Sequence, residues 1–201
     1  MGTMTTNAGF LAAPDPDDAA QEMYADDIAD LGYVMNLSRL WAFDARALDG
    51  IFAVARRVAH DAELSIRDRL LIVLSTSAAR RSSYCVYAWG TKFDTELDPL
   101  SAAAVVRGDD EPVGLTRPEV ALVHWARAVA LAPHSTSTAD VDRLRETGWT
   151  DRQIFALTVF AAIRLAFATI NDALGVSPDV ELAVSTPAAL REAVDFGRPP
   201  A

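Results

Sequence analysis

Cysteine and lysine are almost absent from this sequence, which has one cysteine, Cys85, and one lysine, Lys92, among 201 residues. A single cysteine excludes any disulfide within the chain, and with it the redox couple of a two-cysteine enzyme. No stretch alternates polar and apolar residues over a useful length, and no basic segment followed by an apolar one stands at the N-terminus. We therefore expect an all-α protein located in the cytoplasm.

The charge balance is strongly acidic, with a formal net charge of −10 at pH 7. This charge argues against nucleic acid or an anionic membrane surface as the main partner. The most apolar run, 154–170, contains Arg164 and follows helix-capping residues, so it predicts a buried helix rather than a membrane span. The histidines do not match any metal-ligand spacing, and we expect neither a metal nor another cofactor.

Length and composition predict one globular domain, because 201 residues with 51% hydrophobic content can form one well-buried core. Residues 1–16 are small, polar and rich in proline, which is typical of a flexible arm. The domain is expected over 17–197, with seven to nine helices, and 198–201 form a short tail.

Capping signals mark several helix starts. Thr116 and Glu119 form a capping box that predicts a helix over 117–131, and Thr150 and Gln153 form a second that predicts one over 151–174. Thr138 is expected to cap a shorter helix between them.

The expected helix over 151–174 is apolar on almost every face. Such a helix must be covered on all sides, which is easiest if another subunit supplies part of the cover, so we expect a homo-oligomer. Arg164 and Asn171 interrupt its apolar surface, and if they are buried they require a partner or a ligand. A role at a subunit interface is equally open.

The stretch 65–90 joins a predicted buried helix to the only cysteine. Ser65 is a suitable N-cap for a helix over 66–79, which ends at a pair of arginines. A second helix should begin at Ser82 or Ser83 and place Cys85 in its first turn. Free backbone N–H groups and the helix dipole favour a thiolate there.

These residues carry a resemblance to a known family. The run RLLIVLSTSAARRSSYCVYAW, residues 69–89, resembles the peroxidase motif of the carboxymuconolactone decarboxylase and AhpD-like alkylhydroperoxidase superfamily, in its peroxidase-related branch. That motif has a Glu, eleven residues, and then Cys-x-x-Cys-x-x-x-His. Arg69, Tyr84 and Cys85 fall on the family's arginine, aromatic residue and second cysteine.

Three chemical positions of the motif are changed. Leu70 replaces the glutamate of the proton relay, Ser82 replaces the first cysteine, and Trp89 replaces the histidine. The resemblance spans roughly residues 30–176, and implies an AhpD-like helical bundle that forms oligomers. The changed motif does not support two-cysteine peroxidase activity.

We predict a small-molecule pocket between the end of the helix over 66–79 and the first turns of the next helix. The candidate catalytic residues are Cys85, Ser82 and Tyr84, and the candidate substrate-binding residues are Arg80, Arg81, Tyr87, Trp89 and His124. The arginines would bind an anionic substrate group beside the free N–H groups of the helix start.

Each candidate also has a purely structural interpretation. Cys85 can be an inert buried thiol, and Ser82 a simple N-cap. The aromatic rings can pack in the core, His124 can be half-buried and satisfied, and the arginines can pair with surface acids.

Three functions follow from these interpretations. The first is a cofactor-free decarboxylase, lyase or isomerase acting on a small organic acid or aromatic metabolite. The second is a non-catalytic oligomeric binding protein, and the third is a residual one-cysteine peroxidase. A polar pocket at Cys85 would favour the enzyme, whereas rings filling that space would favour the binding protein.

Overall fold

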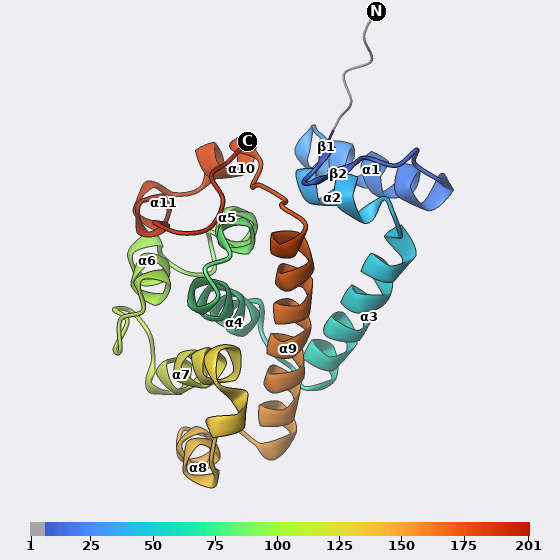
Figure 1. The fold of residues 1–201 in the computed structure, drawn as a ribbon. Coiled ribbons are helices and arrows are strands. Elements are labelled where there is room, and N and C mark those ends of the chain that lie inside the picture. Colours follow the sequence, from blue (N-terminus) through green and yellow to red (C-terminus); the bar gives the residue numbers. More distant parts are fainter. Residues whose placement is uncertain (1–6) are drawn as a thin grey trace, which may run out of the picture.

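The computed structural model describes residues 7–201, and helices dominate it (Figure 1). This part of the chain has eleven α-helices, more than the seven to nine expected. Its elements are β1 (Asn7–Ala8), β2 (Leu11–Ala12), α1 (Asp18–Leu31), α2 (Asn36–Trp41), α3 (Ala45–Asp61), α4 (Ile66–Ala79), α5 (Ser83–Lys92), α6 (Pro99–Arg107), α7 (Arg117–Leu131), the 3-10 turn η1 (Pro133–Ser135), α8 (Thr138–Glu146), α9 (Asp151–Ala173), α10 (Val180–Ser185) and α11 (Ala188–Ala193).

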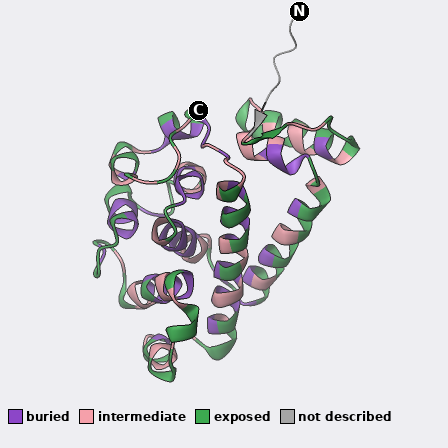
Figure 2. Cartoon of the chain, viewed as in Figure 1, coloured by how far each residue is buried: buried purple, intermediate pink, exposed green. Residues whose placement is uncertain are grey.

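Helix α4 is the centre of the fold. It packs against α5, α6, α7 and α9, and every residue from Leu70 to Ser77 is buried (Figures 1 and 2). Ser75 and Thr76 tolerate this burial because their hydroxyls donate to the carbonyls of Leu71 and Ile72, one turn earlier. The motif segment therefore lies in the densest part of the core.

Helix α9 is covered on one side only. It packs against α3, α4 and α7, whereas Phe155 is 69% exposed and Ile170 is 36% exposed. The chain itself therefore covers only part of this helix, and the expected cover from another subunit stays a prediction. Among the described residues α9 is also the one helix long and apolar enough to cross a membrane.

The capping residues explain where most helices begin. The predicted capping boxes start α7 at Thr116 and α9 at Thr150, and the predicted N-cap Ser65 starts α4 with a capping box as well. Helix α8 begins one residue earlier than expected, because Ser137 rather than Thr138 forms its capping box.

Residues 7–16 belong to the segment expected to be a flexible arm, but they are placed against the body of the protein. β1 and β2 form a two-stranded antiparallel hairpin, and the N–H of Phe10 donates to the carbonyl of Leu174 at 2.8 Å. Gly175 has a positive φ of 82°, and a Cβ there would lie 2.6 Å from the Phe10 ring. The close approach therefore requires glycine. Residues 1–6 of the expected arm lie outside the described residues.

The C-terminal segment closes over the same end of the bundle. Asp179 accepts from the N–H of Asn36 at 2.7 Å, and the N–H of Ala201 donates to Pro178 at 2.9 Å. Asp179 is also the N-cap residue of α10, but its side chain makes no capping bond to that helix. The short α10 thus begins without a side-chain cap of its own.

Candidate functional site

A tight turn redirects the chain between α4 and α5. Arg81 has a φ of 57°, in the left-handed region that non-glycine residues adopt only at a cost of about 1 kcal/mol. The N–H of Ser82 returns to the carbonyl of Ser77 at 2.8 Å, which closes the end of α4. Helix α5 then starts at Ser83 and places Cys85 in its first turn, as predicted.

Cys85 faces the core rather than an open pocket. It is 2% exposed, and Nη2 of Arg164 on α9 lies 3.6 Å from its Sγ. Burial raises the pKa of the Cys85 thiol, and the Arg164 guanidinium only partly opposes this. The expected lowering of its pKa is therefore wrong, because the loss of water outweighs the helix start and the nearby cation.

Arg164 sits inside a cage of aromatic rings. Its guanidinium carbon lies 5.2 Å from the ring centre of Phe52, 5.2 Å from Trp89 and 4.9 Å from Phe167. Stacked rings of this kind stabilise a desolvated guanidinium by about 2 kcal/mol. Burial nevertheless lowers the pKa of Arg164, and Cys85 opposes that shift. Among the described residues, no carboxylate pairs with Arg164, and its Nε has no hydrogen-bond partner.

A small pocket lies at the C-terminal end of α4, close to the predicted position. Its volume is about 320 Å³, and it is lined by Arg80, Leu165, Ala168, Thr169, Asp172 and Ala173. The position agrees with the prediction at Arg80, but the other wall comes from α9 and not from the first turns of α5.

Asp172 is the titratable acid of this pocket. Burial raises the pKa of its carboxyl, and the Ser82 hydroxyl and Arg198 oppose the rise. Arg80 also lines the pocket and is exposed. A half-buried carboxyl and a cation that line the same concave site favour acid–base chemistry.

Tyr84 and Tyr87 do not contribute to this site. Both pack in a separate cluster with Leu40, Val176 and Leu182. The Tyr84 hydroxyl donates to Asp179 at 2.5 Å, and burial raises its pKa well above the ordinary value. The catalytic role of Tyr84 stays a prediction, and in the structure its side chain joins α5 to the C-terminal segment.

His124 and Arg81 also lie away from the pocket. His124 is exposed on α7, with Nε2 2.7 Å from the carbonyl of Asp110. The guanidinium of Arg81 is over the Phe196 ring at 5.6 Å. Of the predicted residues, only Trp89 joins Cys85 at the buried cation, and only Arg80 lines the pocket, with Ser82 beside it.

Three residues of the candidate site were not predicted from the sequence, namely Phe52, Phe167 and Asp172. Arg164 was recognised only as a polar group that needs a partner if it is buried. Asp172 follows Arg164 by eight residues on the same apolar helix, so the same rule applied to it could have selected it. In the described part of the chain, no three His, Cys, Asp or Glu side chains are placed to hold a metal ion.

Solved structures with the same architecture identify the fold. The crystal structure of the alkylhydroperoxidase AhpD core of an uncharacterized peroxidase-related protein from Ralstonia eutropha JMP134 superposes with a TM-score of 0.77, at 23% identity, over 98% of this chain and all of that one. This protein has the AhpD-core fold. An uncharacterized peroxidase-related protein from Silicibacter sp. TM1040 gives the same TM-score at 22% identity, over 89% of this chain and 96% of that one. No family model and no curated protein matches the sequence.

Proposed function

We propose that this AhpD-fold protein is a cofactor-free enzyme of lyase or isomerase type that acts on a small organic acid. The observation that carries the proposal is the pocket at the end of α4, which is lined by both the half-buried Asp172 and the exposed Arg80. Its volume of about 320 Å³ fits a small metabolite rather than a large cofactor.

The chemistry follows from the two charged groups. Arg80 binds the carboxylate of the substrate, and the ionised Asp172 accepts a proton from the carbon next to it. Return of that proton to the other face or to a neighbouring carbon completes an isomerisation. In a decarboxylation, the protonated Asp172 instead delivers its proton to the carbon that has lost carbon dioxide. Leu165 and Ala168 provide the apolar side of the pocket.

Peroxidase chemistry is the weaker alternative. A thiol peroxidase needs an accessible thiolate, whereas Cys85 is 2% exposed and burial raises its pKa. Leu70 and Trp89 also remove both ends of the proton relay found in the family that the sequence resembles. The peroxidase-related names of the two solved structures belong to those proteins.

A panel of small organic acids in deuterated water tests the proposal. The wild-type protein should catalyse deuterium exchange or release of carbon dioxide with at least one acid, and Asp172→Asn should lower that rate by about a hundredfold. Because only the ionised Asp172 accepts a proton and burial raises its pKa, exchange should speed up as the pH rises through that pKa.

Asp142→Asn is the matched control, because Asp142 is a partly exposed acid on α8 that pairs with Arg145 and lies outside the pocket. It should leave the rate unchanged. Equal rates for wild type and Asp172→Asn, or no turnover of any acid in the panel, would contradict the proposal.

A non-catalytic binding protein is the second candidate. One observation favours it: the rings of Phe52, Trp89 and Phe167 fill the space around Arg164 beside Cys85, as expected for a degenerate site. Binding of organic acids without exchange or decarboxylation would select this candidate.

We also propose that the protein is a homo-oligomer that covers the exposed face of α9. Phe155 and Ile170 lie on this face, and the exposed Ala162 and Ala166 lie between them at helical spacing. An exposed apolar stripe along a helix whose other side packs in the core is typical of an interface between subunits.

Phe155→Asp should therefore shift the protein from oligomer to monomer at micromolar concentration, with unchanged circular dichroism. Sedimentation velocity measures the shift, and Leu100→Asp on α6, at a side chain 65% exposed, is the control. A wild-type protein that already sediments as a monomer would remove this part of the proposal.

A further inference from the structure

The N-terminal hairpin and the C-terminal tail both reach the end of α9 that carries Asp172 (Figure 1). The N–H of Phe10, in the hairpin, donates to the carbonyl of Leu174 at 2.8 Å. In the tail, Nη2 of Arg198 donates to the backbone carbonyl of Asp172 at 3.2 Å. Neither segment lines the pocket at Arg80, but both lie next to the acid that does.

Arg198 is the cation of the tail that acts on Asp172. Burial raises the pKa of the Asp172 carboxyl, and the Ser82 hydroxyl and the charge of Arg198 oppose that rise. Arg198 is itself half-buried, and its Nε is enclosed without a hydrogen-bond partner among the described residues. A charge that is partly shielded from water acts more strongly on its neighbours than an exposed one does.

Three other polar groups surround Asp172. Ser82 is fully buried in the turn before α5, and Arg80 lines the pocket from the end of α4 but is exposed to solvent that screens its charge. Cys85 on α5 is a neutral thiol whose pKa is raised by burial and, to a smaller extent, by the charge of Asp172. In the described part of the chain, Arg198 is therefore the cation that favours the ionised form of Asp172.

Two contacts hold Arg198 in this position. The hydroxyl of Ser83 donates to its carbonyl at 2.8 Å, and its guanidinium carbon lies 4.7 Å from the centre of the Phe10 ring. Phe10 is 68% exposed, so its ring adds little to the core. The ring instead packs between the guanidinium and the backbone of Gly175, where a side chain would not fit.

We propose that Arg198 is a positioning residue of the acid–base site, which keeps Asp172 in the ionised form that accepts a proton, and that Phe10 holds Arg198 in place. The C-terminal tail and the N-terminal hairpin are thus parts of the site, although neither touches the substrate. This inference rests on the function proposed for Asp172 and names the charge that tunes that residue.

The carbon-13 chemical shift of the Asp172 carboxyl, assigned with Asp172→Asn, measures this effect without any substrate. Arg198→Ala should raise the pKa of Asp172, because the ionised carboxylate loses its nearby cation. Arg198→Lys keeps the charge and should stay close to wild type. Phe10→Ala should shift the pKa in the same direction as Arg198→Ala, and the double variant should shift it no further than Arg198→Ala alone, because Phe10 acts through Arg198.

The pH profile of deuterium exchange provides a second measurement. On its rising limb, Arg198→Ala should exchange about fivefold more slowly than wild type, since less of its Asp172 is ionised. At higher pH the two rates should agree within about twofold, because Asp172 is then ionised in both proteins. A purely structural role of Arg198 would lower the rate at every pH.

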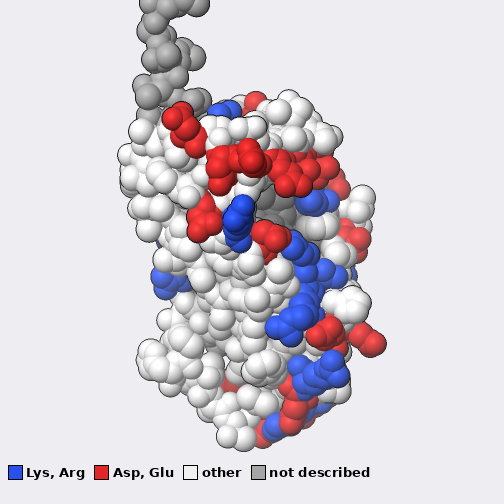
Figure 3. Space-filling view, turned by 90° about the vertical axis from the view of Figure 1, so that its right-hand side faces the viewer, with Lys and Arg blue, Asp and Glu red and all other residues white. Residues whose placement is uncertain are grey.

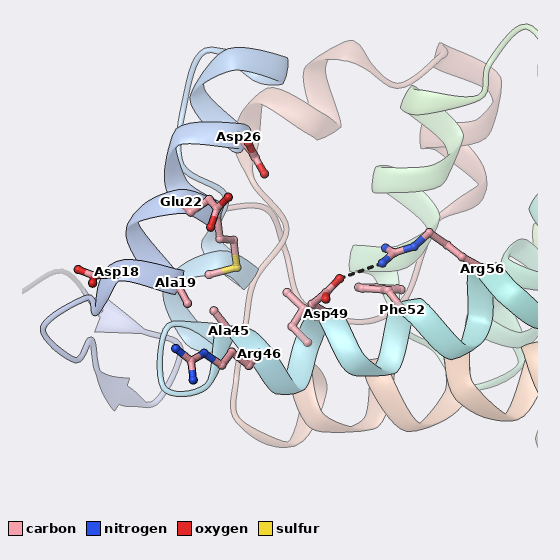
Figure 4. Close-up of a pocket in the computed structure, with 11 residues that line it drawn as sticks. Asp18, Ala19, Glu22, Asp26, Ala45, Arg46, Asp49, Phe52 and Arg56 are labelled. Carbon is pink, nitrogen blue, oxygen red and sulfur yellow. Dashed lines mark hydrogen bonds and ion pairs between the residues drawn. The ribbon is translucent and has the colours of Figure 1, made fainter.

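A larger cleft between α1 and α3 supplies the control. Its volume is about 600 Å³, it is hollowed into the face shown in Figure 3, and it shares no lining residue with the pocket at Arg80. Arg56 lines this cleft and pairs with Asp49 at 2.8 Å (Figure 4). Arg56→Ala removes the same charge as Arg198→Ala, and should leave both the pKa of Asp172 and the exchange profile unchanged.

The outcomes separate this inference from the proposed function. An unchanged pKa of Asp172 in Arg198→Ala, an equal rise in Arg198→Ala and Arg198→Lys, or additive shifts from Phe10→Ala and Arg198→Ala would overturn it. If wild type exchanges no acid but the pKa shifts as expected, the proposed function fails and the link between Arg198 and Asp172 stands.

Discussion

Phe160→Asp is expected to lower the free energy of unfolding by about 4 kcal/mol, because it buries an unpaired carboxylate and removes a core ring. Phe160 is 4% exposed, and its ring lies 6.3 Å from that of Trp89. Its loss therefore disturbs both the main core and one wall of the cage around Arg164. Urea denaturation followed by circular dichroism measures the change.

Two further aspartate substitutions, at less buried positions, provide a comparison for this change in the free energy of unfolding. Phe43→Asp, at a side chain 55% exposed before α3, should change the free energy of unfolding by less than about 1 kcal/mol. Ile163→Asp should fall between the two, since Ile163 is only partly buried. Equal stability of the Phe160 and Phe43 variants would show that α9 does not pack on the core through this residue.

The helices could be predicted from the sequence because their starts depend on neighbouring residues. The capping boxes at Thr116 and Thr150 each combine a hydroxyl and an acid or amide three residues apart, and the structure confirms both. The central position of α4 was harder to predict from the sequence, because a helix that is buried on all sides has little amphipathic pattern. The long α9 has the same apolar character but is covered on one side only.

The candidate site was predictable only in part, because its contacts join residues far apart in the chain. The partner of Tyr84 is Asp179, 95 residues later, and that bond directs the tyrosine away from Cys85. The partner of Cys85 is Arg164, 79 residues later. The residues next to a side chain in the sequence do not show which distant polar group will lie beside it in the fold. The Arg80 side of the pocket was predictable because the turn after α4 is local, whereas its α9 wall comes from residues far along the chain.

Burial also explains why the motif could suggest a reactive cysteine that the fold does not provide. The helix start at Cys85 supplies a favourable dipole worth about 1 kcal/mol, and the cost of desolvating a thiolate is larger. Trp89 and Phe52 keep water from Arg164, so the cation that could stabilise the thiolate is itself desolvated. The pair therefore favours a neutral thiol.

Cys85 should consequently react with a thiol reagent about a thousandfold more slowly in the folded protein than in urea, because the reaction requires local opening that costs about 4 kcal/mol. The pH dependence provides a second check. Since only the thiolate reacts and burial raises the pKa of Cys85 above its ordinary value of 9.0, the rate in the folded protein should still increase above that pH. In the unfolded protein the rate should level off near it.

The double change Cys85→Ala and Ser135→Cys places a thiol at an exposed position instead, and this control should react as fast folded as unfolded. Wild-type protein supplied with peroxide and a dithiol should show no turnover that depends on Cys85, because a thiol that the reagent cannot reach is also closed to peroxide and to the reductant. If the thiol reagent labels Cys85 in the folded wild type at a rate within about tenfold of the rate in the unfolded protein, α5 opens readily. Cys85 would then be accessible, and the one-cysteine peroxidase would replace the acid–base enzyme as the better explanation of the site.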